Sequence, residues 1–262
     1  MKTCYTITAM LFSVSVIAQP GSWKQIGKAG EWANTMLAVQ ANDKMYTVNK
    51  SGALYVTNTV TGAWRQIGKQ DSANTAFIFA DNSLLYTIET SGTLLVIDPD
   101  NGSWKQVGKT GSWIGTIAGT MLNGKLYTVE KTGAFFVTDP SIGNWFQIGN
   151  RDYGSTWRMW TANKKIYTLE TNGNLYEINP NDGARKQVGT SGAWKGTITG
   201  VVMDNLLYTI ESSGALYVTD LSIGISKQLG GPDFAATLFM TAGTNKIYTI
   251  ETSGSLHEVH VY

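Results

Sequence analysis

The sequence is poor in cysteine and histidine, which removes two common ways of stapling a fold or building a site. Cys4 is the single cysteine among 262 residues, so no disulfide can form within the chain. The two histidines, His257 and His260, lie together near the last residue without a second cluster of ligands, which predicts no metal site. Nucleophile elbows, phosphate loops and zinc motifs are also missing. We therefore expect no cofactor, and a binding protein rather than an enzyme.

The sequence also lacks a charge excess and a long apolar run. Its 20 basic residues nearly balance its 19 acidic ones, whereas nucleic acids and anionic membranes require a basic surface. The apolar run from Ile7 to Ala18 follows Lys2 and is too short to span a bilayer. It is typical of a secretory signal peptide. We expect cleavage after Ala18, secretion to the extracellular space or periplasm, no nucleic-acid partner and no membrane insertion.

What the sequence does contain is a motif that recurs six times. Each copy has a Gly-x-Trp-x-Gln-Ile-Gly-like segment, a loop, an apolar run led by threonine, and a segment like Leu-Tyr-Thr-Ile-Glu-x-Ser-Gly-x-Leu-Tyr-Val-Thr-Asp. The tyrosine of the Tyr-Thr pair is present in every copy, at Tyr46, Tyr86, Tyr127, Tyr167, Tyr208 and Tyr248. Repeats of about 40 residues are typical of propellers and solenoids.

Each repeat contains four short β-rich segments separated by turns. In the third repeat they are 116–122, 125–130, 134–139 and 144–148, and glycine-containing hairpins connect them. Frequent glycine and β-branched residues, with no 3.6-residue period, argue against helix. The sequence therefore predicts an all-β, six-bladed β-propeller with four antiparallel strands per blade, occupying 19–262 as one domain after the signal peptide 1–18. Residues 21–26 match an outermost strand and 255–260 a third strand, so the N-terminal strand is expected to complete the last blade.

A second period of two blades underlies the first. The loop that leads into each blade alternates between a longer and a shorter form, which defines three units starting near 21, 102 and 183. The longer loops carry Gly-x-Trp, with Trp32, Trp113 and Trp194. The shorter loops carry Asp71, Asp152 and Asp233. If the longer loops bind a ligand, this period predicts about three equivalent sites per chain.

The candidate ligand-binding residues lie on the rim where these loops meet the hairpins. Trp32, Trp113 and Trp194 are candidate stacking platforms for sugar rings, with packing between blades as the alternative. The candidate polar contacts are Glu89, Glu130, Glu170, Glu211, Glu251, Asp71, Asp152 and Asp233. The outer-strand tryptophans are interpreted as structural; they are Trp23, Trp64, Trp104 and Trp145. Trp157, Arg158 and Trp160 break the pattern of the innermost strand in the fourth blade.

The order of the innermost strand, Leu-Tyr-Thr-Ile-Glu, Gly-x-Leu-Tyr and Trp-x-Gln-Ile resembles the tectonin repeat of tachylectin-like propeller lectins. The resemblance covers 19–262, although tyrosine and mostly glutamate stand where that family has tryptophan and asparagine in the second strand. It implies a carbohydrate-binding protein that engages glycans or glycoconjugates at repeated shallow sites, with multivalent attachment. Two alternatives are a protein–protein interaction propeller and a six-bladed hydrolase or lactonase, which would require acidic or metal-binding residues in the central channel.

Overall fold

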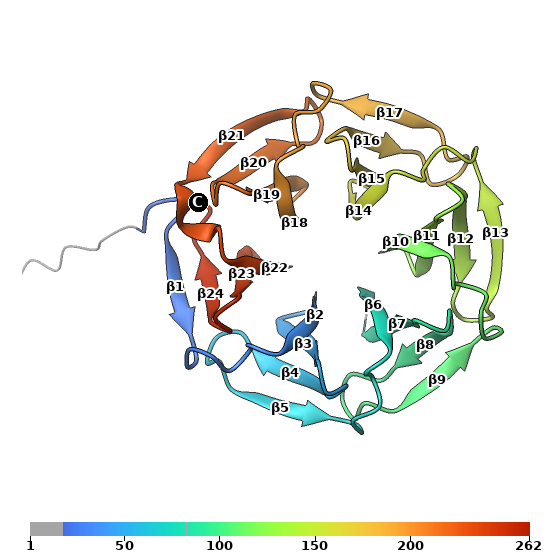
Figure 1. The fold of residues 1–262 in the computed structure, drawn as a ribbon, viewed down its shortest axis with the longest axis horizontal. Coiled ribbons are helices and arrows are strands. Elements are labelled where there is room, and N and C mark those ends of the chain that lie inside the picture. The colour runs from blue at the N-terminus through green and yellow to red at the C-terminus, as the bar shows by residue number, and fades with distance from the viewer. Residues whose placement is uncertain (1–17, 82) are drawn as a thin grey trace, which may run out of the picture.

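The computed structural model describes residues 18–81 and 83–262, which form a closed ring of six four-stranded antiparallel sheets (Figure 1). The six-bladed propeller predicted from the sequence is confirmed. Residues 1–17 of the expected signal peptide lie outside the described residues. We number the blades I to VI from the first complete blade in the chain.

Each blade runs from an innermost to an outermost strand. Blade I comprises β2 (Thr35–Ala41), β3 (Lys44–Asn49), β4 (Leu54–Asn58) and β5 (Trp64–Ile67), and blade II comprises β6 (Thr75–Asp81), β7 (Leu84–Glu89), β8 (Leu94–Ile97) and β9 (Trp104–Val107). Blade III comprises β10 (Thr116–Leu122), β11 (Lys125–Glu130), β12 (Phe135–Asp139) and β13 (Asn144–Ile148), and blade IV comprises β14 (Thr156–Ala162), β15 (Lys165–Glu170), β16 (Leu175–Ile178) and β17 (Arg185–Val188). Blade V comprises β18 (Thr197–Met203), β19 (Leu206–Glu211), β20 (Leu216–Asp220) and β21 (Ile225–Gly230), and blade VI comprises β22 (Thr237–Gly243), β23 (Lys246–Glu251), β24 (Leu256–Val259) and β1 (Trp23–Ile26).

The second strand of every blade is buried on both faces, because a neighbouring blade covers each side of the sheet. In β7, for example, Leu85, Tyr86, Thr87 and Ile88 are all buried in succession. The sequence of such a strand is nearly continuously apolar and does not alternate between apolar and polar residues. The invariant Tyr-Thr pair therefore belongs to the core, as the sequence predicts.

The hairpin after this strand requires glycine, because the loop entering the next blade lies directly against it. Gly92 has a φ of 74°, and a Cβ there would lie 2.3 Å from the backbone nitrogen of Ile114. No side chain fits at that distance, and the left-handed conformation also favours glycine. Each hairpin is thus tied to the loop that follows its blade.

Blade VI is completed by the N-terminal strand, which closes the ring. β1 pairs antiparallel with β24, with Trp23 opposite Val259 and Gln25 opposite His257. The backbone of His260 also donates to the carbonyl of Ser22, at 2.8 Å. This pairing covers the β24 edge that would otherwise be open to other chains, and it confirms the predicted closure.

In the described part of the chain, one helical turn interrupts the β structure: the 3₁₀ segment η1 (Pro232–Phe234) in the loop before blade VI. Over the part of the chain that the structure describes, no helix has the length and apolarity needed to cross a membrane.

Candidate functional site

Each loop that enters a blade carries one residue that meets the hairpin of the preceding blade, and in five of the six loops its large side chain is buried between the two blades. We call this residue the wedge. Its backbone N–H donates to the glycine carbonyl of the preceding blade's hairpin, as in Trp113 to Gly92 at 3.1 Å. The six wedges are Trp32, Ser72, Trp113, Tyr153, Trp194 and Phe234. The alternation found in the sequence is therefore an alternation of wedges.

The three predicted stacking tryptophans are all wedges, and all are buried. Their exposed fractions are only 3–4%. Each indole Nε1–H donates to a buried threonine on the third strand of the blade that the loop enters: Trp32 to Thr57, Trp113 to Thr138 and Trp194 to Thr219, at 3.2–3.4 Å. A ring that is packed between two blades offers no face to a sugar. This burial corrects the expectation that these tryptophans are stacking platforms.

The predicted aspartates precede the wedges of the shorter loops and lie in three different settings. Asp71 accepts a hydrogen bond from the Trp104 indole of blade II at 3.0 Å. Asp152 forms an ion pair with Arg185 at 3.2 Å. Asp233 is exposed within η1. A ligand-binding role for these residues stays a prediction.

The predicted glutamates end the second strands and face the start of the innermost strands. Glu89 and Glu251 accept hydrogen bonds from the hydroxyls of Thr75 and Thr237, both at 2.9 Å. Burial raises the pKa of Glu89, while the Thr75 hydrogen bond partly opposes this. Glu170 is bound by Arg185, whereas Glu130 and Glu211 are half-buried. Their contact with a ligand also stays a prediction.

The outer-strand tryptophans, which were expected from the sequence to have structural roles, are accessible to solvent. Trp23, Trp64, Trp104 and Trp145 have exposed fractions of 44–52%. They lie on the outermost strands β1, β5, β9 and β13, which belong to four consecutive blades along one arc of the ring (Figure 1). Their position on the outermost strand of each blade indicates this exposure in the sequence, because such a strand has a neighbouring strand on one side only.

Beside Trp64 lies a pocket that we call the side pocket of blade I. It has a volume of about 220 Å³, and its lining includes Trp64, Tyr55, Glu31 and Asn49, together with the wedge Trp32. Trp64 and Tyr55 meet edge to face, with ring centroids 5.3 Å apart. The pocket thus joins two aromatic rings with a carboxylate and an amide.

Asn49 stands in this pocket where the other five blades carry glutamate. Its Oδ1 accepts hydrogen bonds from the backbone of Ser51 and Ala53, both at 3.0 Å, and from the Ser51 hydroxyl at 2.7 Å. The hairpin thereby holds the amide in a fixed orientation. The Nδ2 group has no protein partner among the described residues and remains available as a donor.

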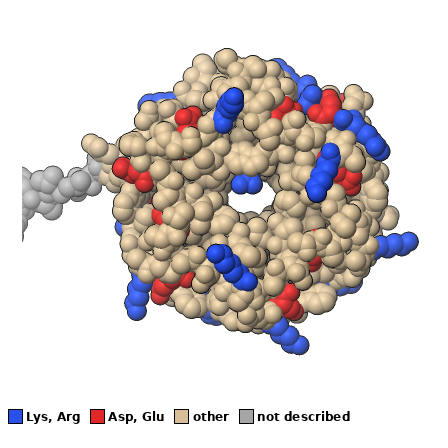
Figure 2. All heavy atoms as spheres, viewed as in Figure 1, with Lys and Arg blue, Asp and Glu red and all other residues tan. Residues whose placement is uncertain are grey.

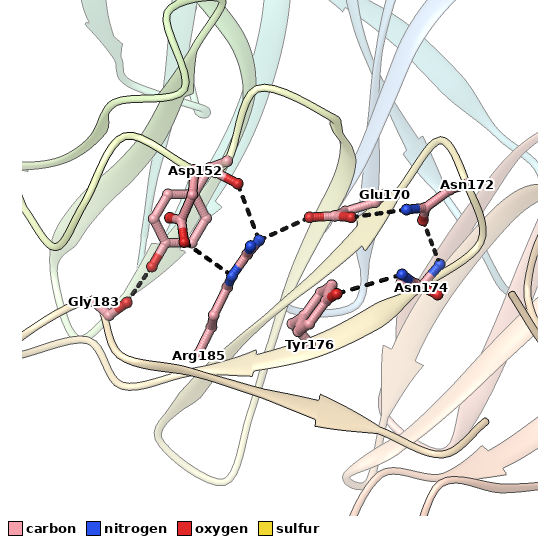
Figure 3. A network of polar contacts seen from close by, with 8 residues as sticks. Asp152, Glu170, Asn172, Asn174, Tyr176, Gly183 and Arg185 are labelled. Atoms are coloured by element: carbon pink, nitrogen blue, oxygen red, sulfur yellow. Dashed lines mark hydrogen bonds and ion pairs between the residues drawn. The ribbon is translucent and has the colours of Figure 1, made fainter. Parts of the chain in front are cut away.

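The equivalent place in blade IV is filled by the protein itself (Figure 3). Arg185 stands where blade I has Trp64, and its guanidinium bonds Glu170 Oε1 at 2.9 Å and the Asp152 carbonyl at 3.0 Å. The same group lies over the Tyr176 ring, 4.7 Å from its centroid. The charge, the hydrogen bonds and the stacking of Arg185 are thus all satisfied within the protein. Its side chain occupies the place that is open in the side pocket of blade I.

Beyond these pockets, acidic and basic side chains are scattered over the face seen in Figure 2 without forming a single-sign patch. Within residues 18–81 and 83–262 there is no group of three or more histidine, cysteine, aspartate or glutamate side chains that could hold a metal ion.

Comparison with known proteins identifies the fold but no family. No protein family matches the chain, and no curated protein shows significant sequence similarity to it. Similar solved structures include a protein of unknown function from Bacteroides thetaiotaomicron, with 14% identity, coverage of 91% of this chain and 73% of that one, and a TM-score of 0.65. Virginiamycin B lyase from Staphylococcus aureus has 14% identity, 88% and 81% coverage and a TM-score of 0.60. YCF48 from Cyanidioschyzon merolae has 13% identity, 85% and 81% coverage and a TM-score of 0.57. These likenesses place the chain among β-propellers.

Proposed function

We propose that this protein is a secreted carbohydrate-binding propeller whose most complete site is the side pocket of blade I. The observation that carries the proposal is the half-exposed Trp64 indole beside Tyr55, Glu31 and Asn49 in one pocket. The C–H faces of a sugar ring stack on aromatic planes, and its hydroxyls need directed donors and acceptors nearby. The tectonin-like order of the repeats supports the same class of ligand.

The six blades are not equal as sites under this proposal. Blades VI, I, II and III carry a half-exposed tryptophan, blade IV carries Arg185, and blade V carries Ser226. In blade II the Trp104 indole is already bonded to Asp71. Binding is therefore expected along one arc of the ring, strongest at blade I, instead of at three equivalent points. Attachment to a glycan-coated surface would gain from simultaneous engagement of this arc.

The test is a glycan array with the mature protein, followed by calorimetric titration with the strongest glycan. Trp64→Ala should weaken binding by about tenfold or more, as expected for the loss of a central aromatic contact. The matched control is Ile225→Ala, on the outermost strand of blade V, where 65% of the side chain is exposed and the neighbouring Ser226 occupies the tryptophan position. Equal binding by both variants and the parent would overturn the proposal.

A second candidate function is protein docking, and a different groove favours it. Between blades II and III a groove of about 400 Å³ is lined by Leu84, Val96 and Ile142. Ile142 is 66% exposed, and on the neighbouring strand β13 Phe146 is 59% exposed. Exposed apolar residues around a groove are common at protein interfaces. An array without glycan binding, together with partner capture that Ile142→Asp abolishes, would favour this function.

Secretion is part of the proposal because the first 18 residues have the composition of a signal peptide. The intact mass of exported protein should correspond to a chain that begins at Gln19 or its cyclised form. Exported protein that retains Met1 would contradict it.

A further inference from the structure

The central channel is a cavity separate from the side pocket of blade I. It has a volume of about 390 Å³ and is lined by the innermost strands of all six blades. Figure 2 shows it as an open hole in the middle of the molecule, with basic side-chain atoms at its wall. Its size lies within the range of small-molecule pockets.

The channel wall is almost entirely uncharged. Most lining residues are apolar, and they include the aromatic residues Phe77, Phe79, Trp157, Trp160 and Phe239. Arg158 on β14 is the one charged side chain among the described residues that line it. The side pocket of blade I contains a carboxylate and an amide, whereas the channel contains a single cation within mostly apolar walls.

The strand register shows that Arg158 is an exception to the repeat. The residue two positions after the leading threonine follows a bulge in all six innermost strands. At this level the other blades place Leu37, Phe77, Ala118, Thr199 and Phe239. The position is thus apolar or small except in blade IV, so packing of the ring does not require a cation there.

Among residues 18–81 and 83–262, no acidic side chain forms an ion pair with Arg158. Its guanidinium lies 4.5 Å from the centroid of the Trp157 ring, and none of the ion pairs among the described residues involves it. The side chain reaches water in the channel, yet the surrounding protein lowers the pKa of the guanidinium by desolvation. Arginine nevertheless keeps its charge at neutral pH, so Arg158 presents a cation without an acidic partner among the described residues to the channel.

We propose that the central channel binds a small organic monocarboxylate with an apolar body, held by Arg158. The guanidinium presents two parallel N–H donors that match the two oxygens of a carboxylate. Phe77 and Phe239 line the channel at the same strand level and contact the apolar body. This site recognises charge and apolar surface, whereas the side pocket of blade I recognises hydroxyls.

The test is calorimetric titration of the mature protein with 3-phenylpropionate and, as its neutral match, 3-phenylpropionamide. The carboxylate should bind with one site per chain, and the amide should bind about tenfold more weakly or not at all, because a charge-assisted pair is lost. Absence of carboxylate binding at millimolar concentration, or equal binding of the two compounds, would overturn the proposal. This comparison uses the unaltered chain and needs no variant.

Two matched variants locate the site. Arg158→Met keeps the length of the side chain without its charge and should lower carboxylate affinity about tenfold or more. Arg151→Met, at an exposed arginine outside the channel lining, should leave the affinity unchanged. Equal affinities in both variants would contradict the assignment. Trp64→Ala should leave carboxylate binding intact, so this site and the proposed glycan site fail or succeed separately.

Discussion

The wedge tryptophans and the outer-strand tryptophans place the same side chain in opposite environments. Trp113 between blades II and III is 3% exposed and donates its indole N–H to Thr138, whereas Trp145 on the outermost strand of blade III is 44% exposed. A residue between two blades is covered from both sides, but one on the last strand of a sheet has its outer side open. Location in the ring therefore decides whether an aromatic residue is buried between blades or remains accessible to a ligand.

The largest loss of stability is expected on deletion of the outermost strand β1, and a much smaller loss on replacement of its tryptophan alone. Removing residues 19–28 deletes β1, leaves the β24 edge unpaired and should cause aggregation or a large fall in Tm. Trp23→Ala keeps the strand and should lower Tm by only a few degrees, because nearly half of its side chain is already exposed. Calorimetry and light scattering measure both. A truncated chain that melts close to the full-length protein would show that closure contributes little.

The next largest loss of stability is expected for a buried wedge tryptophan, in comparison with an exposed tryptophan on the outermost strand of the same blade. Trp113→Ala should destabilise the protein by about 3–5 kcal/mol, because a large cavity opens between blades and Thr138 loses its partner. Trp145→Ala should cost about 1 kcal/mol or less. Urea unfolding gives both free energies. Trp113→Phe, which refills much of the space, should lie between them, and similar losses at positions 113 and 145 would erase the distinction.

A smaller effect is expected where Arg185 replaces the outer-strand tryptophan. Arg185→Ala leaves Glu170, whose side chain is 8% exposed, without its cation and should cost about 1–3 kcal/mol. The matched change is Lys165→Ala in the same blade, which removes the more exposed pair with Glu177 and should cost about 0–1 kcal/mol. Denaturant unfolding at low and high salt distinguishes them. If the two variants lose equal stability, the ion pairs of Arg185 in blade IV do not stabilise the protein more than an exposed pair does.

The smallest expected effect is a pH dependence of stability at His257, where β1 pairs with β24 in blade VI. Trp23 stacks on His257 with ring centroids 4.1 Å apart, and burial lowers the pKa of His257 below its ordinary value of 6.5, with Glu251 partly opposing this. The unfolded chain then takes up the proton first as pH falls. Stability from this group is complete above pH 6.5 and declines as pH drops towards the folded pKa.

Replacing His257 by phenylalanine, the residue found at the equivalent position 136, should flatten this dependence. Tm measured from pH 7.5 to pH 5 checks it, with His260→Phe as the control at the neighbouring histidine. An unchanged slope in His257→Phe would assign the acid sensitivity to other groups.

The fold could be predicted from the sequence because every blade repeats the same local signals. The Tyr-Thr core pair, the glycine of each hairpin and the leading threonine recur at constant spacing, and closure follows from matching 21–26 with the strand missing from the last repeat. The site could not be predicted in the same way. Burial of Trp113 depends on Gly92 and Thr138, which belong to different blades, and sequence spacing does not show which side of a loop they cover.

The two-blade period also explains why three equivalent sites were expected. The period is present in the wedges, where tryptophan alternates with Ser72, Tyr153 and Phe234. The accessible tryptophans follow a different distribution, over four consecutive blades and then none. Arg185 was visible as a substitution, but its partners Asp152 and Glu170 come from a loop and another strand, and only their meeting in three dimensions shows a filled pocket.

We expect the ligand to be recognised through the half-exposed Trp64 in the side pocket of blade I, and not through the three buried tryptophan wedges acting as equivalent sites. Calorimetric titration of the strongest array glycan into three proteins tests it most directly: the mature chain, Trp64→Ala and Trp194→Phe, with folding of each checked by circular dichroism. We predict that Trp64→Ala weakens binding about tenfold or more while Trp194→Phe binds like the parent. Undiminished binding by Trp64→Ala, together with loss in a folded Trp194→Phe, would contradict the account.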